Sequence, residues 1–253
     1  MSEQTDARGR EGFRRGFAMR PPLRAWSLTV AGADNITPRM RRVRFTAPDL
    51  AEMNWRPGQD LVLALPQPNS AIARRHYTIR SIDGGELAID FVLHGESPAT
   101  AWARSARAGE TIEAQGPRGR TSVRADAAHH YFVGDETCLP GIFAMVESLP
   151  AAARGAILIE IGDDADKQEI AAPTGISLRW ISRGGARPGP SALLLGELKA
   201  LTPDPAGAHA YIIGETSNVR AQRHYLVERG FAREQITAEG YWRPGRIGGH
   251  DHV

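Results

Sequence analysis

The sequence contains no long hydrophobic segment, and its longest apolar run, at residues 156–161, is far too short to cross a bilayer. Its first residues are polar and rich in arginine, so they lack the apolar stretch of a secretory signal peptide. Cys138 is the only cysteine, which excludes an internal disulfide and any multi-cysteine metal site. These absences predict a soluble cytoplasmic protein with no membrane contact.

Lysine is almost absent as well. Of the 31 basic residues only Lys167 and Lys199 are lysines, so the other 29 are arginines. A biased genome composition explains this excess, although individual arginines bind carboxylates and phosphates better than lysines do. The net charge is only +2, which argues against a nucleic-acid-binding protein. With 253 residues, 42% of them hydrophobic, the chain has the size and composition of one large or two ordinary globular domains.

The first half of the chain has the hydrophobic pattern of β-structure. Residues 1–20 show no apolar period and are predicted to form a flexible tail. Alternating apolar and polar residues predict strands at 26–30, 42–46, 61–65, 76–82, 86–94 and 111–115. Only one short helix is expected, at 98–106. Six strands with turn signals between them predict a small antiparallel barrel, which we place at residues 21–126.

After residue 126 strands alternate with helices. The pattern predicts strands at 131–133, 156–161, 178–182, 211–213 and 235–239, and helices at 140–149, 191–201 and 217–229. This alternation is typical of a doubly wound parallel sheet, and we expect such an α/β domain at 127–240, followed by an aromatic and basic tail at 241–253. Dinucleotides bind at the carboxyl ends of such strands, but the absence of G-x-G-x-x-G disfavours a Rossmann dehydrogenase.

The tetrapeptide Arg75-His76-Tyr77-Thr78 lies on a predicted barrel strand. Arg75 and Tyr77 share one face of that strand, and His76 and Thr78 share the other. An arginine, an aromatic ring and a hydroxyl suit a ligand with phosphates, a flat ring and a polar ring edge. From spacing alone, a half-buried strand with one packing tyrosine is the alternative.

Together with other segments, this tetrapeptide resembles the siderophore-interacting proteins, which are flavin-dependent ferric-siderophore reductases of the ferredoxin-reductase-like superfamily. Residues 75–78 are similar to the R-x-Y-[ST] flavin motif of that superfamily. The resemblance also rests on DFVLHG at 90–95, PATAWA at 98–103, GPRG at 116–119, GDET at 134–137 and YWRPG at 241–245. These segments follow in the family's order over residues 23–245.

The resemblance implies that the barrel binds FAD. Arg75 would bind the pyrophosphate, Tyr77 would stack on the isoalloxazine, and Thr78 would hydrogen-bond near N5. The other barrel residues that it places at the cofactor are His76, Asp90, Val92, His94, Pro98, Thr100, Ala101 and Trp102. Two of these have ordinary alternatives, because His94 suits a hydrogen-bonded strand position and Trp102 suits the core.

The resemblance also implies that the α/β domain binds NADPH or NADH. Thr137, Gly214, Glu215 and Trp242 would lie near the flavin and nicotinamide, with glycine allowing a close approach of the ligand. Ser182 and Arg183 would bind the 2′-phosphate of NADPH, although Arg183 could instead be a solvated loop residue. Cys138 stands where the family has alanine, and we expect a buried small side chain rather than a redox thiol.

The function implied is NAD(P)H-dependent reduction of ferric siderophores, which releases iron because hard oxygen chelators hold Fe(III) far better than Fe(II). No residue has to act as acid, base, nucleophile or metal ligand. An anionic ferric siderophore would dock on Arg118, Arg120, Arg243 and Arg246, each of which could also be an ordinary surface arginine. Two alternatives stay open: a flavin oxidoreductase fed by reduced ferredoxin, and a siderophore-binding protein without turnover. We expect a monomer.

Overall fold

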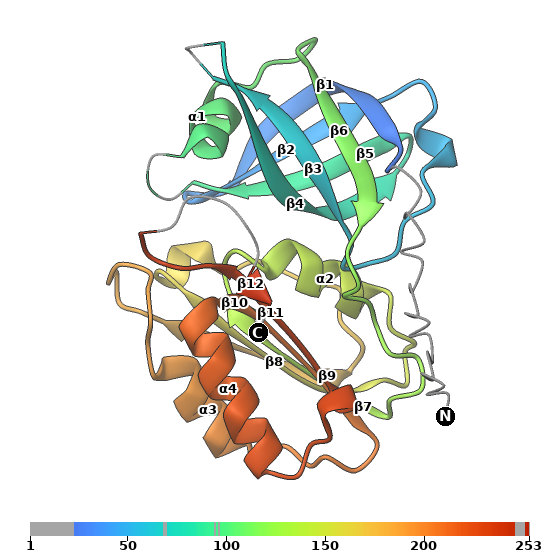
Figure 1. Cartoon of the computed structure of the whole chain (residues 1–253). Coiled ribbons are helices and arrows are strands. Elements are labelled where there is room, and N and C mark those ends of the chain that lie inside the picture. The colour runs from blue at the N-terminus through green and yellow to red at the C-terminus, as the bar shows by residue number, and fades with distance from the viewer. Residues whose placement is uncertain (1–22, 68–69, 94, 96, 246–250, 253) are drawn as a thin grey trace, which may run out of the picture.

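A computed structural model shows a β-barrel stacked on an α/β layer (Figure 1). It describes residues 23–67, 70–93, 95, 97–245 and 251–252. The tail expected at 1–20, as well as His94 and Arg246, lies outside these residues.

The barrel predicted from the sequence is confirmed. Its strands are β1 (Ala25–Thr37), β2 (Met40–Thr46), β3 (Asp60–Pro66), β4 (Ile72–Asp83), β5 (Glu86–Val92) and β6 (Thr111–Arg118). They close in the order β1-β2-β5-β4-β3-β6, with every neighbouring pair antiparallel. Residues 116 and 117 are part of β6, because a register shift lets the ladder continue until Arg118 pairs with Asp60.

The barrel core follows from the alternation of its strands. Every second residue of β3 and β5 is apolar and faces inward, so Leu61, Leu63 and Ile89 are fully buried. The short helix α1 (Pro98–Ser105) begins at an N-cap where the Ser97 hydroxyl accepts a hydrogen bond from the Thr100 backbone N–H at 3.1 Å. The helix lies against the barrel, because its buried face packs into the barrel core.

The second unit is the predicted parallel sheet with helices. Its elements are β7 (His129–Asp135), α2 (Leu139–Glu147), β8 (Arg154–Ile161), β9 (Gly175–Ser182), α3 (Leu193–Leu201), β10 (Ala208–Glu215), α4 (Thr216–Glu228), β11 (Ile236–Trp242) and β12 (Asp251–His252). Single 3-10 turns occur at η1 (Leu50–Glu52), η2 (Asp164–Asp166) and η3 (Arg233–Gln235). The strand order is β12-β11-β10-β7-β8-β9, and all pairs except β11–β12 are parallel.

The predicted start of a C-terminal tail at residue 241 is wrong. Tyr241 and Trp242 are the last two residues of β11, and Trp242 pairs with Glu215 of β10 after a register shift. The strand therefore extends to the edge of the sheet where β7 and β10 also end.

Helix α2 packs on the sheet face toward the barrel, while α3 and α4 cover the other face (Figure 1). The core beneath α2 continues into the barrel, because Met40 of β2 belongs to it. Two ion pairs add to this contact. Arg80 of β4 binds Glu147 of α2 with both terminal guanidinium nitrogens, at 2.6 and 2.7 Å, and Arg39 binds Asp166 at 2.8 Å. The two units are thus held together by a shared apolar core and by charges.

Within the described part of the chain, no helix combines the length and the apolar character that crossing a membrane would require.

Candidate functional site

A pocket of about 170 Å³ lies where the barrel meets the α/β layer. Its lining from the barrel is Asp60, His76, Tyr77, Thr78, Asp90, Val92, Ser97 and Thr100, and its lining from the α/β layer is Thr137, Pro140, Tyr241 and Trp242. The structure thereby brings together most of the residues that the sequence placed at the flavin. The pocket also lies beside the carboxyl ends of β7 and β11, which is the edge of a parallel sheet where ligands bind.

Tyr77 forms an aromatic wall of the pocket. Its ring contacts Phe91 with the centroids 4.2 Å apart, and Phe91 in turn contacts Trp102 at 5.6 Å. Burial raises the pKa of the Tyr77 phenol above its ordinary value, so this side chain stays neutral. A ring backed by the barrel core in this way is a fixed platform for another flat ring.

Thr78 joins the two halves of the pocket. It is buried, and its side chain forms a hydrogen bond with the side chain of Tyr241 on β11. A Cβ atom on Gly141 of α2 would lie 3.1 Å from Thr78 Cγ2, so the absence of a side chain there lets the helix approach the barrel. The hydroxyl expected to face the flavin therefore lies at the contact between barrel and sheet.

Asp60 was not predicted as a site residue. Its Oδ2 lies 2.5 Å from Nδ1 of His76, and both residues line the pocket. The antiparallel register of β3 and β4 produces this contact, since Asp60 pairs with Thr78 and Val62 with His76. The one feature of the sequence that could have indicated Asp60 is its position directly before the alternating apolar residues of a predicted strand.

Asp90 lines the pocket as expected, but its carboxylate has a protein partner. Arg42 on the adjacent strand β2 donates to both oxygens, at 2.7 and 2.8 Å. The sequence did not suggest this pair, which leaves the Asp90 carboxylate less free to accept a hydrogen bond from a cofactor.

The remaining barrel residues divide into three groups. Arg75 lies outside the pocket lining, and its guanidinium donates to the Arg74 carbonyl at 2.8 Å without forming an ion pair among the described residues. Pro98 occupies the first turn of α1, next to Ser97 and Thr100 at the pocket. Ala101 and Trp102 lie outside the lining: Ala101 is exposed, and Trp102, 6% exposed, packs in the barrel core, which was the alternative left open for it.

The glycines near the ends of β7 and β10 are required by the packing of the protein itself, and the close approach of a ligand there stays a prediction. A Cβ on Gly134 would lie 2.1 Å from Cys138 Sγ and 2.4 Å from the Ile213 carbonyl oxygen. Gly214 has a φ of +140°, and its Cβ would lie 2.5 Å from Asp135 Oδ2. The space beside both glycines is therefore already filled by the protein.

Cys138 is buried as expected. Burial, together with the nearby Asp135 carboxylate, raises the pKa of the thiol well above its ordinary value, and Sγ donates to the Asp135 carbonyl at 2.9 Å. A thiol that stays protonated is a poor nucleophile and a poor redox group.

Arg183 is neither a solvated loop residue nor an open phosphate ligand in this structure. Its side chain is 5% exposed, and it donates to both oxygens of Glu136, at 2.6 and 2.8 Å, and to Glu160 at 3.3 Å. The neighbouring Ser182 is exposed, and its hydroxyl accepts from the Gly184 N–H. The sequence missed this network because its members come from the ends of three separate strands.

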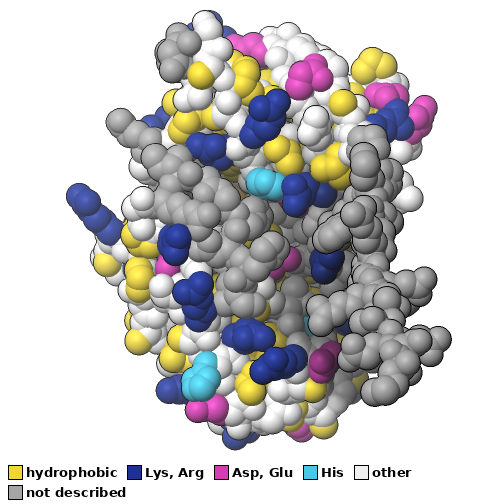
Figure 2. Space-filling view, viewed as in Figure 1, with side chains coloured by type: hydrophobic (Ala, Val, Ile, Leu, Met, Phe, Trp, Pro, Cys, Tyr) yellow, Lys and Arg dark blue, Asp and Glu magenta, His cyan; other side chains and the backbone are white. Residues whose placement is uncertain are grey.

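Three of the four arginines expected to dock a siderophore are described, and all three are exposed: Arg118, Arg120 and Arg243. Arg118 lies opposite the pocket residue Asp60 in the β3–β6 strand pair, and Arg243 directly follows the pocket residue Trp242. Figure 2 shows basic side chains over both the barrel and the sheet on this face, not gathered into one patch.

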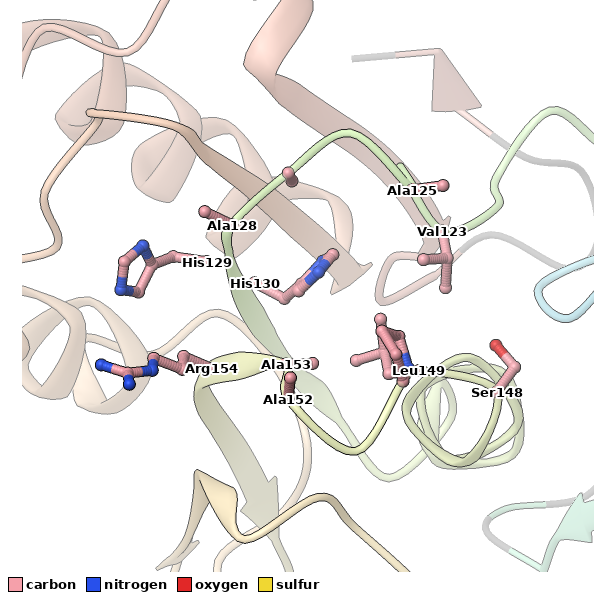
Figure 3. Close-up of a pocket in the computed structure, with 12 residues that line it drawn as sticks. Val123, Ala125, Ala128, His129, His130, Ser148, Leu149, Ala152, Ala153 and Arg154 are labelled. Atoms are coloured by element: carbon pink, nitrogen blue, oxygen red, sulfur yellow. The ribbon is translucent and has the colours of Figure 1, made fainter.

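A larger cavity, of about 650 Å³, lies at the opposite end of the sheet, where β7 and β8 begin (Figure 3). Small apolar residues make up much of its lining, which includes Ala125, Ala153 and Leu149 together with His129 and Arg154. None of the residues predicted for a cofactor lies there. We therefore place the functional site at the smaller pocket between the two units.

Similarity to known proteins shows the family to which the chain belongs. The family description "Siderophore-interacting FAD-binding domain" matches residues 66–121, and "Siderophore-interacting protein" matches residues 127–245. A siderophore utilization protein from T. fusca has a similar crystal structure, with a TM-score of 0.83 and 32% identity over 90% of this chain and 95% of that one.

Two curated relatives are named as reductases. Ferric vibriobactin reductase ViuB of Vibrio cholerae is 34% identical over 179 residues, which cover 68% of this chain and 65% of the relative. The NADPH-dependent ferric-chelate reductase of Escherichia coli is 32% identical over 160 residues, which cover 62% of this chain and 61% of the relative. The aligned part is thus less than two thirds of either relative's length.

Solved ferredoxin reductases share the arrangement of barrel and sheet, with TM-scores of 0.68–0.71 at 11–14% identity, which shows a ferredoxin-reductase-like fold and nothing more specific. The full-length match to the T. fusca protein and the two family matches are more specific. The chain therefore belongs to the siderophore-interacting protein family, and its barrel carries that family's FAD-binding domain.

Proposed function

We propose that this protein is a ferric-siderophore reductase that contains FAD and uses NADPH or NADH. The observation that carries this proposal is the pocket in which the flavin motif of β4 faces the strand ends of the parallel sheet. The names of the ferric vibriobactin reductase and the ferric-chelate reductase among its relatives support the substrate class.

The residues at the pocket fit a flavin. Tyr77 offers a ring fixed against Phe91, and Thr78 offers a hydroxyl beside it. Arg75 keeps a guanidinium that no described carboxylate neutralises, and the N-terminus of α1 lies at the pocket through Ser97 and Thr100. A stacking platform, a hydroxyl and two anion-binding groups correspond to the ring, the ring edge and the pyrophosphate of FAD.

When bound, FAD would accept a hydride from NAD(P)H and pass electrons singly to the Fe(III) of the siderophore. The protein's part is orientation and the exclusion of water. Tyr77 fixes the plane of the ring, while Tyr241 and Trp242 form the pocket wall on the side of the sheet. None of these roles requires a side chain to act as acid or base.

Ser182 and Arg183 remain our proposed determinants of nucleotide preference. A 2′-phosphate can bind the Arg183 guanidinium only if that group leaves Glu136, whereas NADH needs no such change. The choice between the two nucleotides therefore depends on the strength of this buried ion pair.

We propose that an anionic ferric siderophore docks beside the pocket on Arg118, Arg120 and Arg243, together with Arg246, which lies outside the described residues. Changing Arg118 and Arg243 together to Glu should slow reduction of an anionic ferric siderophore and weaken the salt dependence of its rate. A matched control changes Arg107 and Arg233 to Glu, since these exposed residues precede the same two strands at their far ends. An equal effect of both double variants would contradict docking at the pocket.

The proposed function is tested on the purified protein. It should be yellow, and acid should release intact FAD because no motif provides a covalent attachment. Anaerobic NADPH or NADH should bleach the flavin band, and a ferric siderophore should restore it while a ferrous chelator traps Fe(II). A protein that binds no FAD, or a reduced flavin that ferric siderophores do not reoxidise, would refute the proposal.

Arg75→Ala tests the assignment of the motif. Loss of a charge-assisted contact should weaken FAD binding about tenfold to a hundredfold. Arg74→Ala is the matched control, because this exposed neighbour points to the other face of β4. Equal FAD binding by the two variants would remove Arg75 from the site.

A further inference from the structure

The buried carboxylate of Asp135 connects three segments at the edge of the pocket. Its Oδ1 accepts from the backbone N–H and the hydroxyl of Thr137, at 2.9 and 2.5 Å. Its Oδ2 accepts from the Glu215 N–H at 2.8 Å and from the Trp242 indole N–H at 3.0 Å. The turn after β7, the start of α4 and the end of β11 therefore meet on one side chain.

Trp242 is held at a second point as well. Its carbonyl oxygen accepts a hydrogen bond from the Thr216 hydroxyl at 3.0 Å, and its backbone pairs with Glu215 in the sheet. Trp242 is also one of the residues that line the pocket. To leave the pocket wall, the ring would have to break a hydrogen bond to a carboxylate that water does not reach.

The surroundings make Asp135 dependent on its donors. Burial, and after it the charge of the adjacent Glu136, raise the pKa of this carboxyl to about 6. The hydrogen bonds from Thr137 and Trp242 act in the opposite direction and favour the ionised form. Each donor that is lost therefore leaves a buried charge less well satisfied.

We propose that Asp135 is a positioning residue, which fixes the Trp242 indole as a preformed wall of the flavin pocket. The inference deepens the proposed function and depends on FAD being the ligand of this pocket. A wall that is ordered in advance spares the cofactor the entropic cost of ordering it, so FAD is retained longer. Asp135 exerts this effect through Trp242 and does not touch the cofactor.

The test compares four holoproteins: wild type, Asp135→Asn, Trp242→Phe and the double variant. Asparagine is uncharged and has a single acceptor oxygen, so the indole N–H either loses its acceptor or keeps only a weaker, neutral one. The Trp242→Phe change keeps an aromatic ring but removes the indole N–H. Two properties are measured: the near-ultraviolet circular dichroism of Trp242 and the rate at which FAD dissociates on dilution.

The circular dichroism of Trp242 is obtained as a difference with and without this residue, once in the wild-type background and once in the Asp135→Asn background. We expect the difference to be severalfold smaller in the Asp135→Asn background, because the indole is no longer fixed. We expect FAD to dissociate about tenfold faster from both single variants, and the double variant to lose FAD no faster than either one. Thr137→Val, which removes a donor to Oδ1 only, should keep the Trp242 signal.

Multiplied effects in the double variant, or an unchanged Trp242 signal in the Asp135→Asn background, would overturn the proposal. If Asp135→Asn does not fold, Trp242→Phe alone decides, because unchanged FAD dissociation in that variant also overturns it. None of these measurements uses a siderophore or a nicotinamide nucleotide. A failure of the proposed reductase activity is therefore distinguishable from a failure of this inference.

Discussion

Replacing Arg183 with Met would remove the cation that two buried carboxylates share. Arg183 is 5% exposed, and the Glu136 and Glu160 side chains are 11% and 2% exposed, so water cannot replace the guanidinium. Removing one member of a buried ion pair costs about 3–5 kcal/mol. Glu160 keeps a hydrogen bond from the Ser191 hydroxyl at 2.6 Å, which places the expected loss in the free energy of unfolding near the lower end, about 3 kcal/mol.

Urea denaturation of three variants separates the contributions. Arg183→Met should show the full loss, whereas Glu136→Gln should lose less, because Arg183 keeps Glu160 as a partner. The double variant should recover most of the stability lost in Arg183→Met, because it no longer buries the Glu136 charge without a partner. The m-values should stay equal, since none of the changes alters the surface exposed on unfolding.

Steady-state kinetics with both nucleotides completes the experiment. Because we propose that Arg183 binds the 2′-phosphate, Arg183→Met should raise the KM for NADPH at least tenfold more than the KM for NADH. A loss of stability below about 1 kcal/mol would refute the reasoning about the buried ion pair. Equal changes in the two KM values would mean that Arg183 stays on Glu136 in the working enzyme and does not bind the 2′-phosphate.

Two further predictions concern the sheet. Burial lowers the pKa of His209 from 6.5 to about 4, so the unfolded chain takes up a proton at a higher pH than the folded protein does. The free energy of unfolding should therefore fall by up to about 3 kcal/mol as the pH drops from 6.5 to 4. Thermal or urea unfolding of His209→Gln should lack this pH-dependent loss, and parallel curves for the two proteins would contradict the prediction. Gly134→Ala should destabilise the protein by about 3 kcal/mol or more in urea unfolding. Adding Cys138→Ala should not restore the lost stability, because the new Cβ would still lie 2.4 Å from the Ile213 carbonyl oxygen. Full recovery of the stability would show that the clash with the thiol is the whole cause of the loss.

The elements of the fold could be predicted because their signal is local. Alternation along each barrel strand and the rhythm of strands and helices after residue 126 predicted every strand except the two-residue β12, which pairs with β11. The ends of the strands are harder to predict from the sequence. Gly240 looks like the end of β11, yet the strand continues to Trp242 because β10 provides a partner there. Such pairing depends on the neighbouring strand and not on the residues of β11 themselves.

The same distinction applies to the site. The resemblance of residues 75–78 to a flavin motif placed Tyr77 and Thr78 at the pocket, because such a motif lies within one strand and can be recognised in the sequence. Their partners come from elsewhere in the chain. Arg42 on Asp90 and Glu136 on Arg183 are contacts between strands, and no spacing in the sequence predicts them. Which charged groups of the site are paired with one another could therefore be learned only from the structure.

The position of the pocket between two units accounts for the contacts that hold them together. Transfer of a hydride between two cofactors requires their reacting atoms to meet at a fixed distance, and here each unit would carry one of the cofactors. The ion pair between Arg80 and Glu147 and the close approach of Gly141 to Thr78 keep α2 against β4. The strand that carries the flavin motif is thus the strand that fixes the sheet to the barrel. A change that loosens α2 from β4 should impair electron transfer before it impairs the binding of either cofactor.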